Sequence, residues 1–192
     1  MTPIDWHHRL CRVNRGVGLT CGVVLLLACA VILVEIVTRR IAFGILGGTD
    51  ELSGYVMAAV ASWSAGFALI ERAHIRIDLV HRRLPALARA GLDLLALAAL
   101  LTVSIVILVY GGRVLGKSIS AGSTANTPLE TPLWIPQTIW LAGWVWFALA
   151  SLALLVLAAW AMARGEWADA AEIAGPEGDD IPEAAEAAGI RG

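Results

Sequence analysis

The chain has 192 residues, of which 58% are hydrophobic and 16% charged, and its formal net charge is −2 at pH 7. Soluble domains carry about 25% charged residues and about 45–50% apolar ones, so this composition excludes a soluble enzyme and a disordered chain. It predicts an all-α integral membrane protein. The three cysteines, Cys11, Cys21 and Cys29, form neither a disulfide framework nor a zinc motif in the sequence.

Four stretches are long and apolar enough to cross a bilayer, which takes about 20 residues. We expect transmembrane helices over about residues 16–38, 51–70, 90–112 and 136–163. The first stretch resembles a signal peptide because three arginines precede it, but its apolar run continues past Cys29 to Val34. The apolar region of a secretory signal is shorter, about 7–15 residues. We therefore expect this segment to remain in the protein as a helix.

The distribution of basic residues predicts the orientation, because cytoplasmic loops carry an excess of Lys and Arg. Four basic residues flank the expected outer ends of the helices: Arg39, Arg40, Arg113 and Lys117. Nine flank the inner ends: Arg9, Arg12, Arg15, Arg72, Arg76, Arg82, Arg83, Arg89 and Arg164. Both termini should therefore be cytoplasmic. Between the second and third helices, residues 71–86 are predicted to form a basic amphipathic segment that lies against membrane lipid at the head-group layer.

The C-terminal part of the chain differs in composition from the membrane domain, residues 1–163. Residues 164–192 contain eight acids, namely Glu166, Asp169, Glu172, Glu177, Asp179, Asp180, Glu183 and Glu186. Few large apolar side chains accompany them, so this acidic tail is expected to be cytoplasmic and disordered.

The middle of each expected helix contains no Asp, Glu, Lys, Arg or His. Ionisable groups inside a bilayer usually mark ion paths and proton relays, and a buried haem would need a ligand such as histidine within a span. The sequence therefore predicts an accessory subunit with no catalytic residue, no cofactor and no metal site. A ridge of small residues in the second helix, formed by Gly54, Ala58, Ser62 and Gly66, predicts a surface on which another helix packs closely.

Two blocks of sequence are distinctive. The first contains Glu51, Gly66, Glu71, His74-Ile75-Arg76-Ile77-Asp78-Leu79 and Arg83-Leu84-Pro85. The second is Thr131-Pro132-Leu133-Trp134-Ile135-Pro136-Gln137, followed by Gly143. With four spans in this order, the blocks resemble the small permease subunit of TRAP transporters, the DctQ type.

The resemblance implies a non-catalytic scaffold subunit of a tripartite importer in the bacterial inner membrane. Such importers use an ion gradient, typically of Na⁺, to take up organic anions such as carboxylates or sulfonates. The implied partners are a large multi-span permease subunit of the DctM type, which carries the substrate and ion sites, and a periplasmic solute-binding protein of the DctP type. No nucleic acid is implied. Arg39, Arg40, Arg113 and Lys117 are the candidates for contacts with the binding protein.

Three alternatives compete with this interpretation. The small subunit of a tricarboxylate-type tripartite transporter also has four spans, but the block from His74 to Leu79 argues against it. A membrane anchor of a redox enzyme is disfavoured by the absence of intramembrane histidines. A small drug exporter would carry a glutamate in the middle of its first helix, whereas Glu35 follows that apolar run.

Overall fold

The computed structural model describes residues 2–41, 48–72, 86–127 and 129–174. Within these ranges the chain forms five helices: α1 (Pro3–Ile41), α2 (Thr49–Ile70), α4 (Ala86–Ser120), α5 (Trp134–Ala163) and α6 (Trp167–Ala174). Most of the predicted interfacial segment, including His74, Asp78, Arg83 and Pro85, lies outside the described residues.

Four of these helices, α1, α2, α4 and α5, are long and apolar enough to cross a membrane, as predicted. They are longer than the predicted spans, however. The 39 residues of α1 extend about 58 Å at 1.5 Å per residue, well beyond a hydrocarbon core of about 30 Å. Charged residues are excluded from the hydrocarbon but remain good helix formers. The helices therefore continue past the apolar runs, through Arg9 at one end of α1 and through Arg113 and Lys117 in α4.

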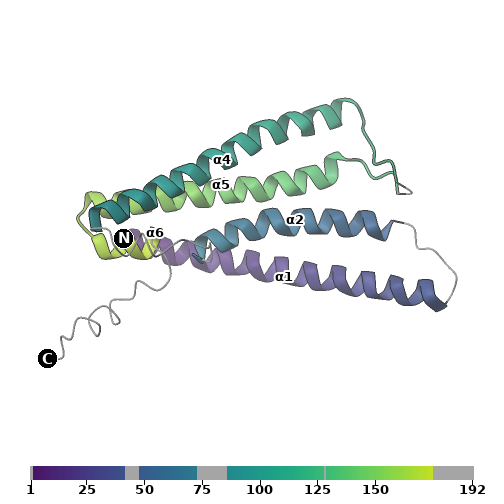
Figure 1. The fold of residues 1–192 in the computed structure, drawn as a ribbon, viewed down its shortest axis with the longest axis horizontal. Helices are drawn as coiled ribbons and strands as arrows, with labels where there is room; N and C mark the ends of the chain where they lie inside the picture. Colours follow the sequence, from purple (N-terminus) through teal and green to yellow (C-terminus); the bar gives the residue numbers. More distant parts are fainter. Residues whose placement is uncertain (1, 42–47, 73–85, 128, 175–192) are drawn as a thin grey trace.

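The four long helices lie in a row in the order α1, α2, α5, α4 (Figure 1). They form two antiparallel hairpins, which pack against each other mainly through α2 and α5, with a smaller contact between α1 and α5. The central position of α5 shows in its burial: 39% of its most apolar stretch is buried, against none of the corresponding stretch of α1. The arrangement is therefore a flat layer that leaves most of α1 exposed.

The buried core lies along one face of α5. It includes Phe147, Ala150, Leu154, Ala158 and Ala161, which recur every three or four residues and so share one side of the helix. Small residues among them allow neighbouring helices to approach closely. Side chains from α2, α4 and α6 complete this core: Leu69, Ile70, Leu97, Ala170, Ile173 and Ala174.

Within the tail that is expected to be disordered, residues 167–174 form the helix α6, and residues 175–192 lie outside the described residues. The helix follows a turn at Gly165, whose φ of +77° favours glycine, and the Glu166 N–H donates to the Ala161 carbonyl at 3.0 Å. Ile173 is 1% exposed, packed with the core at the end of α5. The helix α6 thus has one apolar face, which the packed ends of the other helices cover. The start of α1 and α6 lie at the same end of the layer (Figure 1), here called the inner end.

Candidate functional site

The seam between the two hairpins is closed by small residues. Gly143 of α5 lies against Ser62 of α2, and a Cβ atom built on this glycine would overlap the Ser62 side chain and come within 2.9 Å of its backbone carbonyl carbon. A Cβ on Gly66 would meet the Trp146 indole at 2.5 Å. The two backbones can therefore approach this closely only because these positions lack side chains.

A polar contact also crosses the seam. The Trp63 indole N–H donates to the backbone carbonyl of Ile139 at 3.1 Å. A hydrogen bond between helices adds direction to packing that is otherwise apolar, and in membranes such bonds contribute about 0.6–2 kcal/mol. The contact fixes the register of α2 against α5.

The predicted ridge of small residues is buried at one end and exposed at the other. Ser62 and Gly66 are buried in the seam, so the helix that packs on them is α5 of the same chain, whereas Gly54 and Ala58 are exposed. The cause is geometric, because positions four residues apart advance by about 40° around a helix of 3.6 residues per turn. A straight neighbouring helix can therefore cover only part of such a ridge.

The outer end of the layer has a second link between the hairpins, centred on Glu51. Its carboxylate accepts hydrogen bonds from the Tyr55 hydroxyl at 2.7 Å and from the Thr127 hydroxyl. Thr127 belongs to the connection between α4 and α5, whereas Glu51 belongs to α2. Leu129 of the same connection lies against Gly48, just before α2, where φ is +108°. The connection thus folds over the outer end of α2 and is held there by a charged group.

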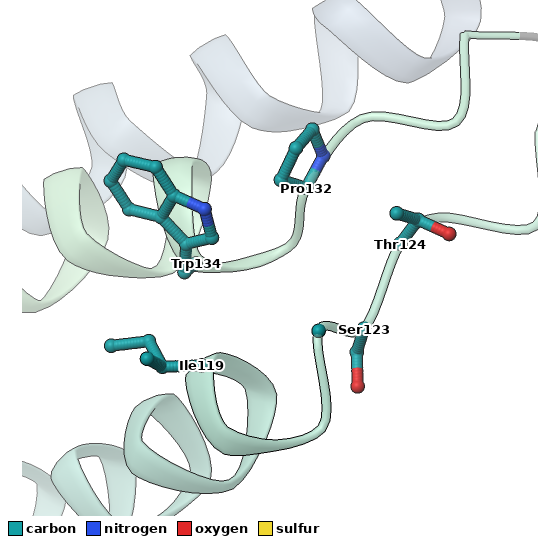
Figure 2. Close-up of a pocket in the computed structure, with 6 residues that line it drawn as sticks. Ile119, Ser123, Thr124, Pro132 and Trp134 are labelled. Atoms are coloured by element: carbon teal, nitrogen blue, oxygen red, sulfur yellow. The ribbon is translucent and has the colours of Figure 1, made fainter.

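The connection between α4 and α5 is itself an ordered hairpin. Thr124 and Pro132 form an isolated antiparallel bridge, the Ala125 N–H donates to the Thr131 carbonyl at 2.9 Å, and the Leu133 N–H donates to Ser123 at 3.0 Å. Beside it lies an open hollow of about 510 Å³. Figure 2 shows Trp134 and Ile119 on one side of this hollow, with Pro132, Ser123 and Thr124 around the rest.

The structure shows where residues of the second sequence block, Thr131 to Gln137 with Gly143, lie. Pro132 and Trp134 line the hollow, Pro136 lies in the first turn of α5, and Gly143 lies in the seam. The block therefore builds the entry into α5 and its contact with α2. Among the described residues, the lining of the hollow is mostly apolar, with the hydroxyls of Ser123 and Thr124 at its edge, and this composition suits apolar contact.

The predicted outer cations do not form one patch. Arg113 and Lys117 are exposed on the outer turns of α4, and the Arg113 guanidinium lies 5.4 Å from the Tyr110 ring centroid. Arg40 is exposed near the end of α1, beside Arg39. Since α1 and α4 are the two flanks of the row (Figure 1), these cations lie on opposite flanks of the outer end.

The hairpin of α1 and α2 is fastened near the inner end by a buried amide. Asn14 is fully buried, and its Nδ2 donates to the Phe67 carbonyl at 3.1 Å. One turn along α1, Gly18 lies against the Phe67 ring, where a Cβ atom would come within 2.5 Å. Glu71, a motif residue, follows α2, and its backbone N–H donates to the same Phe67 carbonyl at 3.1 Å. The end of α2 is thereby tied to α1.

A cluster that the sequence analysis did not find lies at the inner end. His7 and His8 of α1 and Glu172 of α6 place their ligand atoms within 4.8 Å of one another. The Cys11 Sγ atom is 3.7 Å from Nε2 of His7. These residues come from opposite ends of the chain, so only the packing of α6 brings them together, and their spacing in the sequence gives no signal.

Residues 28–162 match the family model described as the DctQ component of tripartite ATP-independent periplasmic transporters, and this range covers well over half of the chain. The chain belongs to the DctQ family. No curated protein and no solved structure matches it. The match confirms the resemblance found in the sequence and favours it over the three alternatives.

As a DctQ component, the chain is a non-catalytic membrane subunit of a tripartite transporter, and the family implies DctM and DctP partners. The matched range contains the seam, the Glu51 link and the hollow, all built by α2, α4, α5 and the connections between them. It excludes the first 27 residues and α6, and with them His7, His8, Cys11 and Glu172.

Proposed function

We propose that this DctQ subunit is a rigid scaffold that holds the DctM-type subunit of an importer of organic anions, such as carboxylates or sulfonates. The observation that carries the proposal is the flat layer of two hairpins, fastened to each other at the seam and at the outer end. A support must keep its shape while its partner moves. Close packing and interhelical hydrogen bonds supply that stiffness, because packed interiors resist deformation.

The flat layer also supplies a large contact surface. Helices in a row expose apolar side chains on both faces, and the exposed set includes Leu26, Met57, Val106 and Leu149 from all four long helices. One face would contact the DctM-type subunit and the other would contact lipid. Exposed apolar surface of this extent marks an interaction site or a membrane-facing surface.

The transport chemistry is assigned to the partner. The expected spans contain no ionisable residue at mid-membrane, where coupled transporters hold such groups. The family description specifies transport without ATP, so an ion gradient is the energy source that fits, with Na⁺ the ion that the family resemblance implies. The substrate and ion sites then belong to the DctM-type subunit.

In the proposed orientation both termini are cytoplasmic, in the bacterial inner membrane, and the outer end faces the periplasm. The excess of arginine near the inner ends supports this orientation. Residues 71–86 would then lie against lipid head groups on the cytoplasmic side. The DctP-type protein would dock at the outer end, where Arg40, Arg113 and Lys117 are exposed.

Reconstitution into liposomes tests the proposal. With the DctM-type subunit, the binding protein, a candidate carboxylate substrate and an inward Na⁺ gradient, we expect uptake only when this subunit is present. Replacing the Na⁺ gradient by a K⁺ gradient should abolish uptake. Uptake by this subunit alone would contradict the proposal, as would full uptake by the DctM-type subunit without it.

A further inference from the structure

We propose that His7, His8 and Glu172 form a binding site for a divalent transition metal, of which Zn²⁺ fits best, and that the metal joins α6 to the start of α1. The site lies at the inner end of the layer, outside the range that matches the DctQ family. It does not rest on the proposed scaffold function.

The distances favour a single ion. Zinc binds imidazole nitrogen at about 2.0–2.1 Å and carboxylate oxygen at about 2.0–2.2 Å, so two ligands of a tetrahedral ion lie about 3.4 Å apart. The three ligand atoms here already lie within 4.8 Å of one another. His8 and Glu172 are exposed, so their side-chain torsions are free to change as an ion draws the ligands together.

The donor set favours a transition metal over Ca²⁺ or Mg²⁺. Two imidazoles and one carboxylate suit Zn²⁺ and its neighbours, whereas Ca²⁺ and Mg²⁺ take oxygen ligands. The three ligands that the described residues supply leave a fourth position for water. Arg72, His8 and Glu172 act electrostatically on His7. Of these three, only the Glu172 carboxylate supplies the negative charge that a cation needs next to the Arg72 guanidinium.

The site is held by packing on both sides. His7 is 5% exposed on α1, and Ile173, which follows Glu172 in the sequence, is 1% exposed in the core. These anchors fix one imidazole and bring the carboxylate to it before any ion binds. Preorganised ligands lose little conformational entropy on binding. Cys11 lies beside His7 but does not belong to the set of ligand atoms that share the 4.8 Å limit.

The test uses the full chain in detergent, purified without a histidine tag and titrated with ZnCl₂ against a fluorescent zinc chelator. We expect one zinc ion per chain and an affinity at least tenfold lower in His8→Ala and in Glu172→Gln. Both side chains are exposed, so these variants should fold, which circular dichroism verifies. Asp169→Asn, also on α6, and Cys29→Ser, also on α1, are the matched controls and should bind as the unmodified chain does.

A second measurement follows α6 itself. Trypsin cleaves after Arg164, whose side chain is 49% exposed at the start of the turn into α6. If cleavage requires α6 to detach, free Zn²⁺ at 100 times its dissociation constant slows it by up to about 100-fold in the unmodified chain, because the ion binds only the attached form. The His8→Ala and Glu172→Gln variants should show no such protection.

Three results would overturn the proposal. One is equal zinc affinity of the unmodified chain and a His8→Ala, Glu172→Gln double variant. Another is an equal loss of affinity in Asp169→Asn. The third is loss of binding in Cys11→Ser with binding intact in Glu172→Gln, which would place the ion on α1 alone.

Discussion

The contact of Gly143 with Ser62 gives the sharpest prediction, because here a single methyl group has no space. In Gly143→Ala the new Cβ would overlap the Ser62 side chain and come within 2.9 Å of its backbone carbonyl carbon. A backbone atom cannot move aside as a side chain does, so α2 must shift away from α5. Overpacking of this kind costs about 1–3 kcal/mol.

Helix propensity opposes the effect of this clash, so a glycine with free space around it is an informative control. Alanine is favoured over glycine inside a helix by about 0.8–1 kcal/mol. Gly112 of α4 has no atom within 4 Å of a built Cβ, so Gly112→Ala should gain this contribution without a clash. The two variants are expected to change stability in opposite directions.

Thermal unfolding of the purified subunit, followed by circular dichroism, measures the difference. At about 2–4 °C per kcal/mol for a chain of this length, Gly143→Ala should lower the midpoint by a few degrees and Gly112→Ala should raise it. Combining Gly143→Ala with Ser62→Gly removes part of the clash and should recover part of the loss. A midpoint for Gly143→Ala equal to that of Gly112→Ala, or no recovery in the double variant, would refute the close approach at the seam.

Three further predictions concern the ends of the layer. Glu51→Ala removes the acceptor of Thr127 and Tyr55, so amide hydrogen exchange should become faster in the connection between α4 and α5, whereas a substitution at exposed Asp50 should leave it unchanged. Ile173→Asp places a charge in the core at the inner end and should detach α6, seen as faster tryptic cleavage after Arg164, while Asp169→Asn should not. Charge reversal of Arg113 and Lys117 together should weaken binding of the DctP-type protein and reduce its salt dependence; an unchanged affinity in a surface-binding assay would remove this flank from the docking surface.

The spans could be predicted because a long apolar run has one interpretation in a membrane protein, and the match to the DctQ family confirms what the two sequence blocks indicated. The pairing of helices could not be predicted. Ser62 and Gly54 belong to the same ridge, and nothing in the sequence distinguishes the one that is buried from the one that is exposed.

Contacts between distant segments also escaped the sequence analysis. Glu51 was identified as a motif residue, but its partner Thr127 lies in another hairpin, and this link exists only after α2 has packed on α5. The helix α6 has only eight residues and would not be stable alone, since short isolated helices are marginal in water. Its burial of Ile173 depends on a surface that the other helices build together.

The layer is one helix thick, so the two hairpins could rotate relative to each other about the long seam between α2 and α5. Among the described residues, contacts between the two hairpins are found at each end of this seam. At the outer end, Glu51 of α2 accepts a hydrogen bond from Thr127, which belongs to the connection between α4 and α5. At the inner end, α6 contacts α1 as well as α4 and α5, and so it contacts both hairpins. Rotation of the hairpins about the seam would have to break the Glu51 link, the contacts of α6 or the direct contact of α1 with α5, so the short helix α6 adds to the stiffness of the whole layer.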